Sequence, residues 1–171
     1  MNTLFVFIAT GLSLVWPCAH AQVTDVGDDY VRAFETELNN YRATHGLAPL
    51  RRNNAIERVA VHHAAYLALL HQKSTGLVAT HDEYTKVEGV KALGSIQRRF
   101  AYFGEINYGE CCAAFEEHAL VAPSALLDAW VESPPHERAL RGSFYGYGLA
   151  ISTVERDGKT IMLAVLTLTN R

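Results

Sequence analysis

Apolar residues recur at helical spacing in two stretches of the first half of the chain. Between residues 28 and 45 an apolar residue follows every three or four positions, and Gly46 stands where a helix usually stops. In the second stretch, Asn54 and Glu57 have the spacing of an N-terminal cap and its reciprocal partner, and Gly76 marks the end. We therefore predict two long amphipathic helices. Their apolar positions are Val31, Phe34, Leu38 and Tyr41, then Ile56, Val59, Ala60, His63, Leu67 and Leu70.

The middle of the chain gives weaker patterns. Residues 77–89 show no periodicity, and apolar spacing favours a short helix over 90–99. Residues 100–113 are rich in aromatic residues and glycine, which is typical of a strand, or a pair of strands, with bends. A helix is predicted over 124–131. It restarts at Ser133, because Ser133 suits an N-cap and the proline after it suits the first helical position.

The C-terminal segment predicts a hairpin. Two stretches rich in apolar residues, 145–154 and 160–169, have the pattern of strands. Asp157-Gly158 between them is a strong turn signal. The last strand is apolar on both faces, so helices must cover both sides of the sheet. We predict an α+β fold, a three-layer α-β-α sandwich around a small antiparallel sheet.

Composition narrows the classes of protein and of partner. The chain has 171 residues, of which 49% are hydrophobic and 19% charged, as in an ordinary single domain. Its formal net charge is −3, and no run of lysine or arginine occurs. Neither nucleic acid nor an anionic membrane surface is therefore an expected partner. The sequence leaves the oligomeric state open.

Residues 1–21 resemble a signal peptide. They contain no Asp, Glu, Lys or Arg, the apolar stretch from Leu4 to Trp16 is short for a spanning helix, and Ala19-His20-Ala21 has small residues where a signal peptidase reads. We expect cleavage before Gln22, a single domain over 22–171, a secreted or periplasmic location and no stable membrane anchor. An uncleaved anchor is the alternative.

Two adjacent cysteines, Cys111 and Cys112, remain after the leader is removed. In an oxidising compartment they form a strained vicinal disulfide, stay as buried thiols, or pair between chains. The chain is in any case not a scaffold held by many disulfides.

The order of six short motifs resembles one known family. The motifs are "LNNYRATHGLAPL", "AVHHA", "THDE", "YGE", "AWVESPPHERAL" and "YGYGLAIS". Together they resemble the CAP superfamily of cysteine-rich secretory, antigen-five and pathogenesis-related proteins (SCP domain), and most closely its bacterial secreted branch. The fold that this resemblance implies is also an α-β-α sandwich.

The resemblance implies a central cleft where two histidines and an acidic residue meet, and which binds a divalent metal in several relatives. Carried over by motif, these are His81, Glu110 and His136. Two imidazoles and a carboxylate suit zinc or a similar cation. Glu105 offers a second Gly-Glu pair, but the distance from Glu110 to the tryptophan fits better. The chain departs from the family at Cys111, where Asn is usual, and a hydrogen-bonded cluster without metal is the alternative.

Two classes of function follow. The first is a secreted binding module, in which a cleft lined by Tyr84, Tyr102, Tyr108 and Cys111 holds a lipid, glycan or peptide, with the metal optional. The second is a metal-dependent extracellular hydrolase. No G-x-S-x-G, H-E-x-x-H, P-loop or dinucleotide motif occurs. Of the remaining histidines, His63 is expected in the core, and His62 and His71 at the solvent surface.

Overall fold

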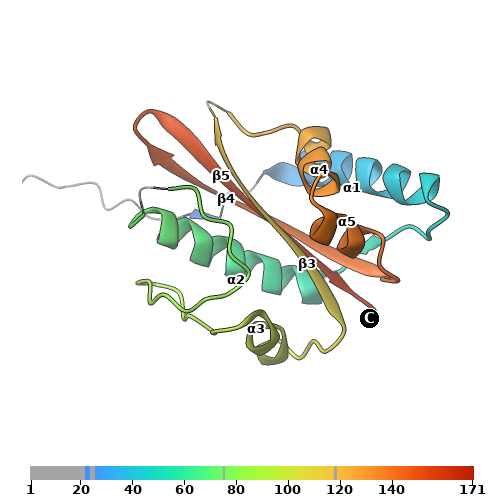
Figure 1. The fold of residues 1–171 in the computed structure, drawn as a ribbon, viewed down its shortest axis with the longest axis horizontal. Coiled ribbons are helices and arrows are strands. Elements are labelled where there is room, and N and C mark those ends of the chain that lie inside the picture. The colour runs from blue at the N-terminus through green and yellow to red at the C-terminus, as the bar shows by residue number, and fades with distance from the viewer. Residues whose placement is uncertain (1–21, 24–25, 75, 118) are drawn as a thin grey trace, which may run out of the picture.

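The computed structural model describes residues 22–23, 26–74, 76–117 and 119–171, and Figure 1 shows their arrangement. The helices are α1 (Gly27–Thr44), α2 (Asn54–His71), α3 (Ile96–Tyr102), α4 (Pro123–Val131) and α5 (Pro134–Leu140). The strands are β1 (Gln22–Val23), β2 (Arg51–Arg52), β3 (Tyr108–Glu117), β4 (Gly146–Arg156) and β5 (Lys159–Thr169). The predicted signal peptide, residues 1–21, lies outside the described residues.

Three long antiparallel strands form the sheet, in the order β4-β5-β3. Asp157 and Gly158 both have positive φ, 53° and 76°, as the predicted tight hairpin turn between β4 and β5 requires. Two-residue strands line the outer edge of β4, where β1 pairs antiparallel and β2 pairs parallel. The sheet is therefore mixed at this edge, although its long strands are antiparallel as predicted. Strand β3 forms the opposite edge of the described sheet.

Helices cover both faces of the sheet (Figure 1). One face packs against α1, α4 and α5, and the other against α2. Strand β5 serves both cores, because Leu163 and Val165 face α2 while Ala164 and Leu166 face the other side. Helix α3 packs with Phe100 against the first turns of α2 and against Tyr108 at the start of β3. The α-β-α sandwich predicted from the two-sided last strand is confirmed.

Helix α2 begins one residue earlier than the cap prediction and ends earlier than its glycine. Asn53, not Asn54, is the N-cap, and its side chain accepts hydrogen bonds from Ala55 N at 2.9 Å and Ile56 N at 3.4 Å. The last helical residue is His71, well before Gly76. No described helix is long and apolar enough to cross a membrane.

The predictions for the middle of the chain need a larger correction. The short helix runs over Ile96–Tyr102 instead of 90–99, so the first part of the expected strand is helical and β3 starts only at Tyr108. Ser95 sets the helix start, because its hydroxyl accepts from Arg98 N at 3.4 Å. By contrast α4 and the restarted helix α5 lie where they were predicted, although the Ser133 side chain makes no cap hydrogen bond.

Candidate functional site

Three segments from distant parts of the chain meet at the free edge of β3. His81 lies in the connection after α2, Glu110 lies in β3, and His136 lies in the first turn of α5. The Nδ1 atom of His81 is 2.9 Å from Glu110 Oε1, and its Nε2 atom is 3.5 Å from His136 Nε2. The structure therefore brings together the three residues that the resemblance implied. We call the two facing rings the His81–His136 pair.

The pair is accessible while the carboxylate beneath it is not. The His81 side chain is 40% exposed, and the Glu110 side chain is fully buried. Because an ionised carboxylate only accepts hydrogen bonds, His81 donates through Nδ1 and keeps the lone pair of Nε2 free. Burial is the main cause that lowers the pKa of His136; the neighbouring His81 adds to this effect and the charge of Glu110 opposes it, so the neutral ring is favoured. When His136 carries its proton on Nδ1, both Nε2 atoms present lone pairs that can bind a cation; when it carries the proton on Nε2, that nitrogen donates to His81 Nε2 instead.

Arg99 neutralises Glu110 from the other side. Its Nη2 atom donates to both carboxylate oxygens, at 2.7 Å for Oε1 and 2.6 Å for Oε2. Burial alone would raise the pKa of Glu110, but the hydrogen bond from His81 and the charges of His63 and Arg99 outweigh it, so the pKa is lowered. Glu110 is therefore an ionised, fully engaged acceptor.

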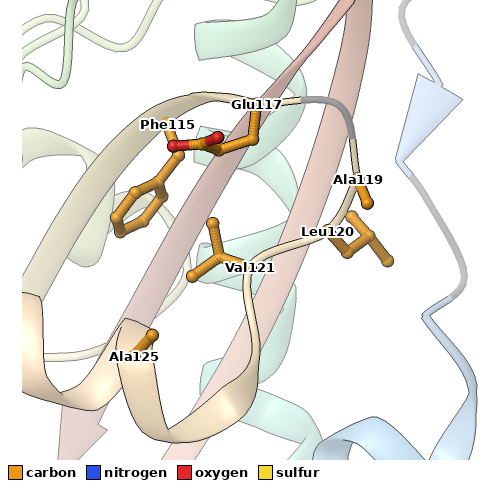
Figure 2. Close-up of a pocket in the computed structure, with 6 residues that line it drawn as sticks. All are labelled: Phe115, Glu117, Ala119, Leu120, Val121 and Ala125. Atoms are coloured by element: carbon orange, nitrogen blue, oxygen red, sulfur yellow. The ribbon is translucent and has the colours of Figure 1, made fainter.

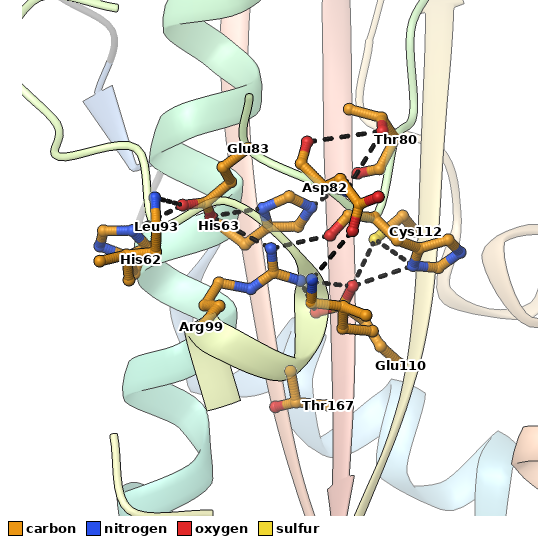
Figure 3. Close-up of polar contacts among 12 residues, drawn as sticks. His62, His63, Thr80, Asp82, Glu83, Leu93, Arg99, Glu110, Cys112 and Thr167 are labelled. Atoms are coloured by element: carbon orange, nitrogen blue, oxygen red, sulfur yellow. Dashed lines mark hydrogen bonds and ion pairs between the residues drawn. The ribbon is translucent and has the colours of Figure 1, made fainter. Parts of the chain in front are cut away.

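The buried network extends to a second carboxylate, Glu83 (Figure 3). Arg99 Nη1 lies 3.2 Å from Glu83 Oε1, His63 Nδ1 lies 2.8 Å from the same oxygen, and His62 Nε2 lies 3.2 Å from Oε2. Burial would raise the pKa of Glu83, but hydrogen bonds from His62, His63 and Leu93 N, with the charge of Arg99, lower it to about 2. Glu83 is therefore ionised.

His63 is held in a way that uses both of its ring nitrogens. Nδ1 faces the Glu83 carboxylate, and Nε2 lies 2.7 Å from the carbonyl oxygen of Thr80. Both partners are acceptors, so both contacts are satisfied only when both nitrogens carry protons. Arg99 lies between the two carboxylates, Glu83 and Glu110, and the His63 ring lies beside Glu83. The ring is fully buried, as expected of a core histidine.

Arg99 also fixes the backbone of the site. Its Nη1 atom donates to the carbonyl oxygen of His81 at 2.9 Å, and Asp82 Oδ1 accepts from Ile96 N at 2.9 Å, which ties the His81 connection to α3. Sequence reasoning missed both Arg99 and Glu83. The available signals were an arginine between the apolar positions Ile96 and Phe100, and an acid two residues after His81.

The cysteines point to opposite faces of β3. Both are free and buried: Cys111 packs in the core with α4 and α5, and Cys112 lies on the α2 side, its Sγ 3.5 Å from Glu110 Oε1. Burial raises the pKa of both thiols, and Glu110 adds to the effect. In this structure the two cysteines are buried thiols, as in the second of the three alternatives. Cys111 is fully buried in the core, and its Sγ lies 3.8 Å from the carbonyl oxygen of His136.

The three tyrosines expected around a cleft lie in different environments. Tyr84 is 72% exposed and lines a cavity of about 370 Å³. Tyr102 is 61% exposed, with Lys91 Nζ 5.1 Å from its ring centre. Tyr108 stacks on Phe100 at 3.9 Å. Neither Tyr102 nor Tyr108 lines the cavity beside Tyr84.

Other sequence expectations can now be placed. Glu105 accepts from the Thr169 hydroxyl at 3.0 Å, and Glu110, not Glu105, contacts His81. His62 is partly buried against Glu83. The expectation that His71 faces solvent is wrong, because the residue is 1% exposed. Its position four residues after Leu67, on the apolar side of α2, could have indicated this.

A larger cavity lies at the other end of β3 (Figure 2). It has a volume of about 550 Å³ and is lined mainly by apolar side chains of β3 and of the connection to α4. The lining residues are Phe115, Glu117, Ala119, Leu120, Val121 and Ala125. None of the three residues at the β3 edge site lines it, so it is a separate feature.

Two sets of donors have the spacing to hold a metal ion. The donor atoms of His63, Glu110 and Cys112 all lie within 4.8 Å of one another. This set fits poorly, because both His63 nitrogens and both Glu110 oxygens are already engaged and Cys112 is a protonated thiol. The His81–His136 pair fits better. Two imidazole nitrogens bound at about 2.0–2.1 Å to a tetrahedral ion lie about 3.3 Å apart, near the observed 3.5 Å.

In this second set Glu110 is not a ligand. It accepts from the nitrogen of His81 that faces away from His136, which is the usual place of the carboxylate that orients a metal-binding histidine. The resemblance implied Glu110 as a direct ligand, whereas the contacts with Arg99 and His81 suit the orienting role.

The fold agrees with the comparisons with known proteins. The family model described as "CAP: Cysteine-rich secretory protein family" matches residues 36–167. The chain therefore belongs to the cysteine-rich secretory protein family. A search of curated proteins gave no match.

Two bacterial structures are similar to this chain. One is an extracellular protein containing an SCP domain from Bacillus anthracis str. Ames, with a TM-score of 0.57 and 20% identity over 82% of this chain and 40% of that protein. The other is an outer surface protein from Borrelia burgdorferi, with a TM-score of 0.58 and 17% identity over 88% of this chain and 99% of that protein. The chain thus spans less than half of the Bacillus protein. At these identities the matches show the shared fold.

Proposed function

We propose that this chain is a secreted binding module whose recognition centre is the His81–His136 pair. The observation that carries the proposal is the convergence of two Nε2 atoms, 3.5 Å apart, above a buried and fully engaged carboxylate. The extracellular and outer-surface proteins with the same fold support a location outside the cytoplasm. The apolar leader, Leu4 to Trp16, supports export through a signal peptide.

The pair would hold a divalent cation, with zinc favoured by two imidazole ligands. His81 and His136 would be the protein ligands, and Glu110 would fix the ring and tautomer of His81. A cation bound there supplies a Lewis-acidic point for an oxygen or nitrogen atom of a ligand. Arg99 keeps Glu110 ionised, so that His81 remains oriented whether or not the cation is bound.

Binding is favoured over hydrolysis by the state of Glu110. A metal-dependent hydrolase needs a base that can reach the attacking water and an acid for the leaving group. Glu110 is buried beneath the rings and already accepts from His81, Arg99 and Cys112. Cys112 is a buried thiol of raised pKa, which opposes its use as a thiolate nucleophile.

Metal analysis of the protein purified without chelator and then loaded with zinc tests the proposal. The unchanged protein should hold one zinc ion per chain, and both His81→Ala and His136→Ala should lose it. His45→Ala is the matched control, since His45 is an exposed histidine whose ring contacts Thr44 and Tyr41 and makes no hydrogen bond to His81 or His136 in the described part of the chain. If both site variants keep stoichiometric zinc, the proposed ligand pair is wrong.

A further inference from the structure

The connection that carries His81 also forms a wall of the 370 Å³ cavity beside Tyr84. Its other walls come from the last turns of α2 and the segment that follows. The lining residues are Tyr66, Leu70, Ser74, Val78, Thr80, Asp82, Tyr84 and Thr85. We call this the Tyr84 cavity. Thr80 and Asp82 are the immediate neighbours of His81, so a ligand in the cavity would sit next to the connection that holds the His81–His136 pair.

The walls divide into an apolar and a polar part. Leu70, Val78 and the ring of Tyr84 offer apolar surface, and Tyr84 is 72% exposed, so its ring is available for stacking. Hydroxyl groups and one carboxylate, from Ser74, Thr80, Thr85 and Asp82, form the polar part. A small ligand with one apolar face and a rim of hydroxyl groups matches this division.

Two polar groups in the wall keep hydrogen-bonding capacity for a ligand. Tyr66 is 1% exposed, and its hydroxyl oxygen accepts from Thr85 N at 3.1 Å but donates its proton to none of the described residues. Asp82 Oδ1 accepts from Ile96 N at 2.9 Å, and Oδ2 has no hydrogen-bond partner in the described part of the chain. The cavity therefore offers an unused buried donor and an unused acceptor. A ligand hydroxyl is both donor and acceptor.

The charge of the walls selects among ligand classes. Asp82 is the lining residue with a carboxylate, and the lining set contains no lysine, arginine or histidine. An anionic ligand would meet the carboxylate without a compensating cation. A purely hydrocarbon ligand would cover the Tyr66 proton and Asp82 Oδ2 without giving either a hydrogen-bond partner, which opposes its binding. A neutral polyhydroxylated ligand avoids both costs.

We propose that the Tyr84 cavity binds a neutral saccharide, with one sugar face on the Tyr84 ring and hydroxyl groups on Asp82 and Tyr66. The inference rests on the proposed binding function and names its ligand class. It does not depend on the cation, because no lining residue belongs to the His81–His136 pair.

Calorimetry and ¹⁵N-resolved NMR titration of the full chain test the proposal. Cellotriose and chitotriose are the neutral probes, trigalacturonate the acidic probe and laurate the apolar one. Either neutral trisaccharide should bind and shift the amide signals of Thr80, Asp82 and Thr85. Failure of both to bind, or tighter binding of trigalacturonate or laurate at these residues, would overturn the proposal.

Variants locate the binding within the cavity. Tyr84→Ala should weaken binding about tenfold, the loss expected when one good contact is removed. Asp82→Asn should also weaken it while keeping Oδ1 for Ile96 N. Tyr102→Ala is the matched control, since this tyrosine is similarly exposed at 61% but outside the cavity. An equal loss in Tyr84→Ala and Tyr102→Ala would contradict the assignment.

Two further measurements separate this proposal from the others. Saccharide binding should persist in His136→Ala and with chelator present. If the unchanged protein binds the sugar but holds no zinc, only the proposed cation site is refuted. A protein that holds zinc but binds no neutral saccharide refutes only the saccharide site. Cosedimentation with insoluble cellulose and chitin distinguishes a polymer from soluble oligosaccharides as the source. If Tyr84→Ala cosediments with cellulose or chitin as well as the unchanged protein does, the polymer is not bound in the Tyr84 cavity.

Discussion

Each face of the sheet buries one arginine, and the two arginines have different partners. Arg42, on the α1 side, is 1% exposed and donates to the carbonyl oxygens of Ala48, Leu140 and Gly142. Arg99, on the α2 side, is fully buried and lies between the carboxylates of Glu83 and Glu110. Arg42 fastens chain segments to one another. Arg99 balances the charges on which the position of His81 depends.

This difference explains where the candidate site lies. The α1 face contains an apolar core in which Trp130 and Phe34 pack edge to face at 5.8 Å. On the α2 face, His63 lies in the buried ion network formed by Arg99, Glu83 and Glu110. A buried ionic network is costly unless every member is paired. Here the pairing fixes the backbone and ring of His81, the residue at which the network reaches the surface.

The largest expected effect comes from removing the guanidinium group of Arg99, which lies at the centre of the buried ion network. Arg99→Met leaves two buried carboxylates without their shared partner, so it should lower the free energy of unfolding by about 3–5 kcal/mol. Urea denaturation followed by circular dichroism measures this. Adding Glu83→Gln and Glu110→Gln should restore much of the loss. No recovery in the triple variant would mean that Arg99 acts through packing alone.

A smaller loss is expected for the arginine of the other face. Arg42→Met leaves carbonyl groups, not charges, without partners, so about 1–3 kcal/mol should be lost in the same denaturation experiment. Combination with Glu83→Gln should be additive, because the two sites share no contact. A loss larger than that of Arg99→Met would reverse the proposed difference between the two faces.

The smallest effect expected is a change of stability with pH. His63 faces an acceptor with each ring nitrogen, whereas His71, on the same helix, faces an acceptor with one and a donor with the other. His71 donates through Nδ1 to Leu67 O at 2.8 Å and accepts through Nε2 from Val78 N at 2.9 Å, which requires the neutral ring. Burial is the main cause that lowers the pKa of His71; Arg156 adds to it, and the hydrogen bond to Leu67 opposes it. The unfolded state therefore binds the proton more readily than the folded state.

The stabilisation by His71 should consequently be complete above the unfolded pKa of about 6.5. It should be lost as the pH falls from there through the lower folded-state pKa. His71→Gln keeps a donor and an acceptor but does not titrate. The difference in unfolding free energy between the two proteins, measured from pH 7.5 to 5, should therefore shift against the unchanged protein on acidification. A constant difference would contradict the neutral, doubly bonded ring.

Sequence patterns predicted the apolar framework better than the polar one. The positions of Phe34, Leu38 and Val59 follow helical spacing, and Leu163 with Leu166 required helices on both faces, so the sandwich was predictable. The spacing of apolar residues along the sequence indicates only which side of a helix or strand is apolar. It could not indicate that Arg99 would be buried, because the partners of Arg99 lie on segments distant in the sequence.

The order of the motifs predicted that His81, Glu110 and His136 lie together, but it did not predict the role of each residue. The role of Glu110 depends on which of its oxygens are engaged, and this follows from the position of α3. The helix start at Ser95, which the apolar spacing of residues 90–99 did not reveal, puts the guanidinium of Arg99 against Glu110. An error of a few residues in one short helix therefore concealed the contacts on which the proposed orienting role of Glu110 rests.

The central claim is that the accessible His81–His136 pair, and not the buried set of His63, Glu110 and Cys112, is where this fold binds a cation. X-ray absorption at the zinc edge of the protein loaded with one equivalent of zinc tests it most directly. We predict imidazole nitrogen at about 2.0–2.1 Å and no sulfur shell, and loss of the imidazole signature in His136→Ala. A sulfur shell at about 2.3 Å that persists in His136→Ala would place the ion at Cys112 and contradict the account.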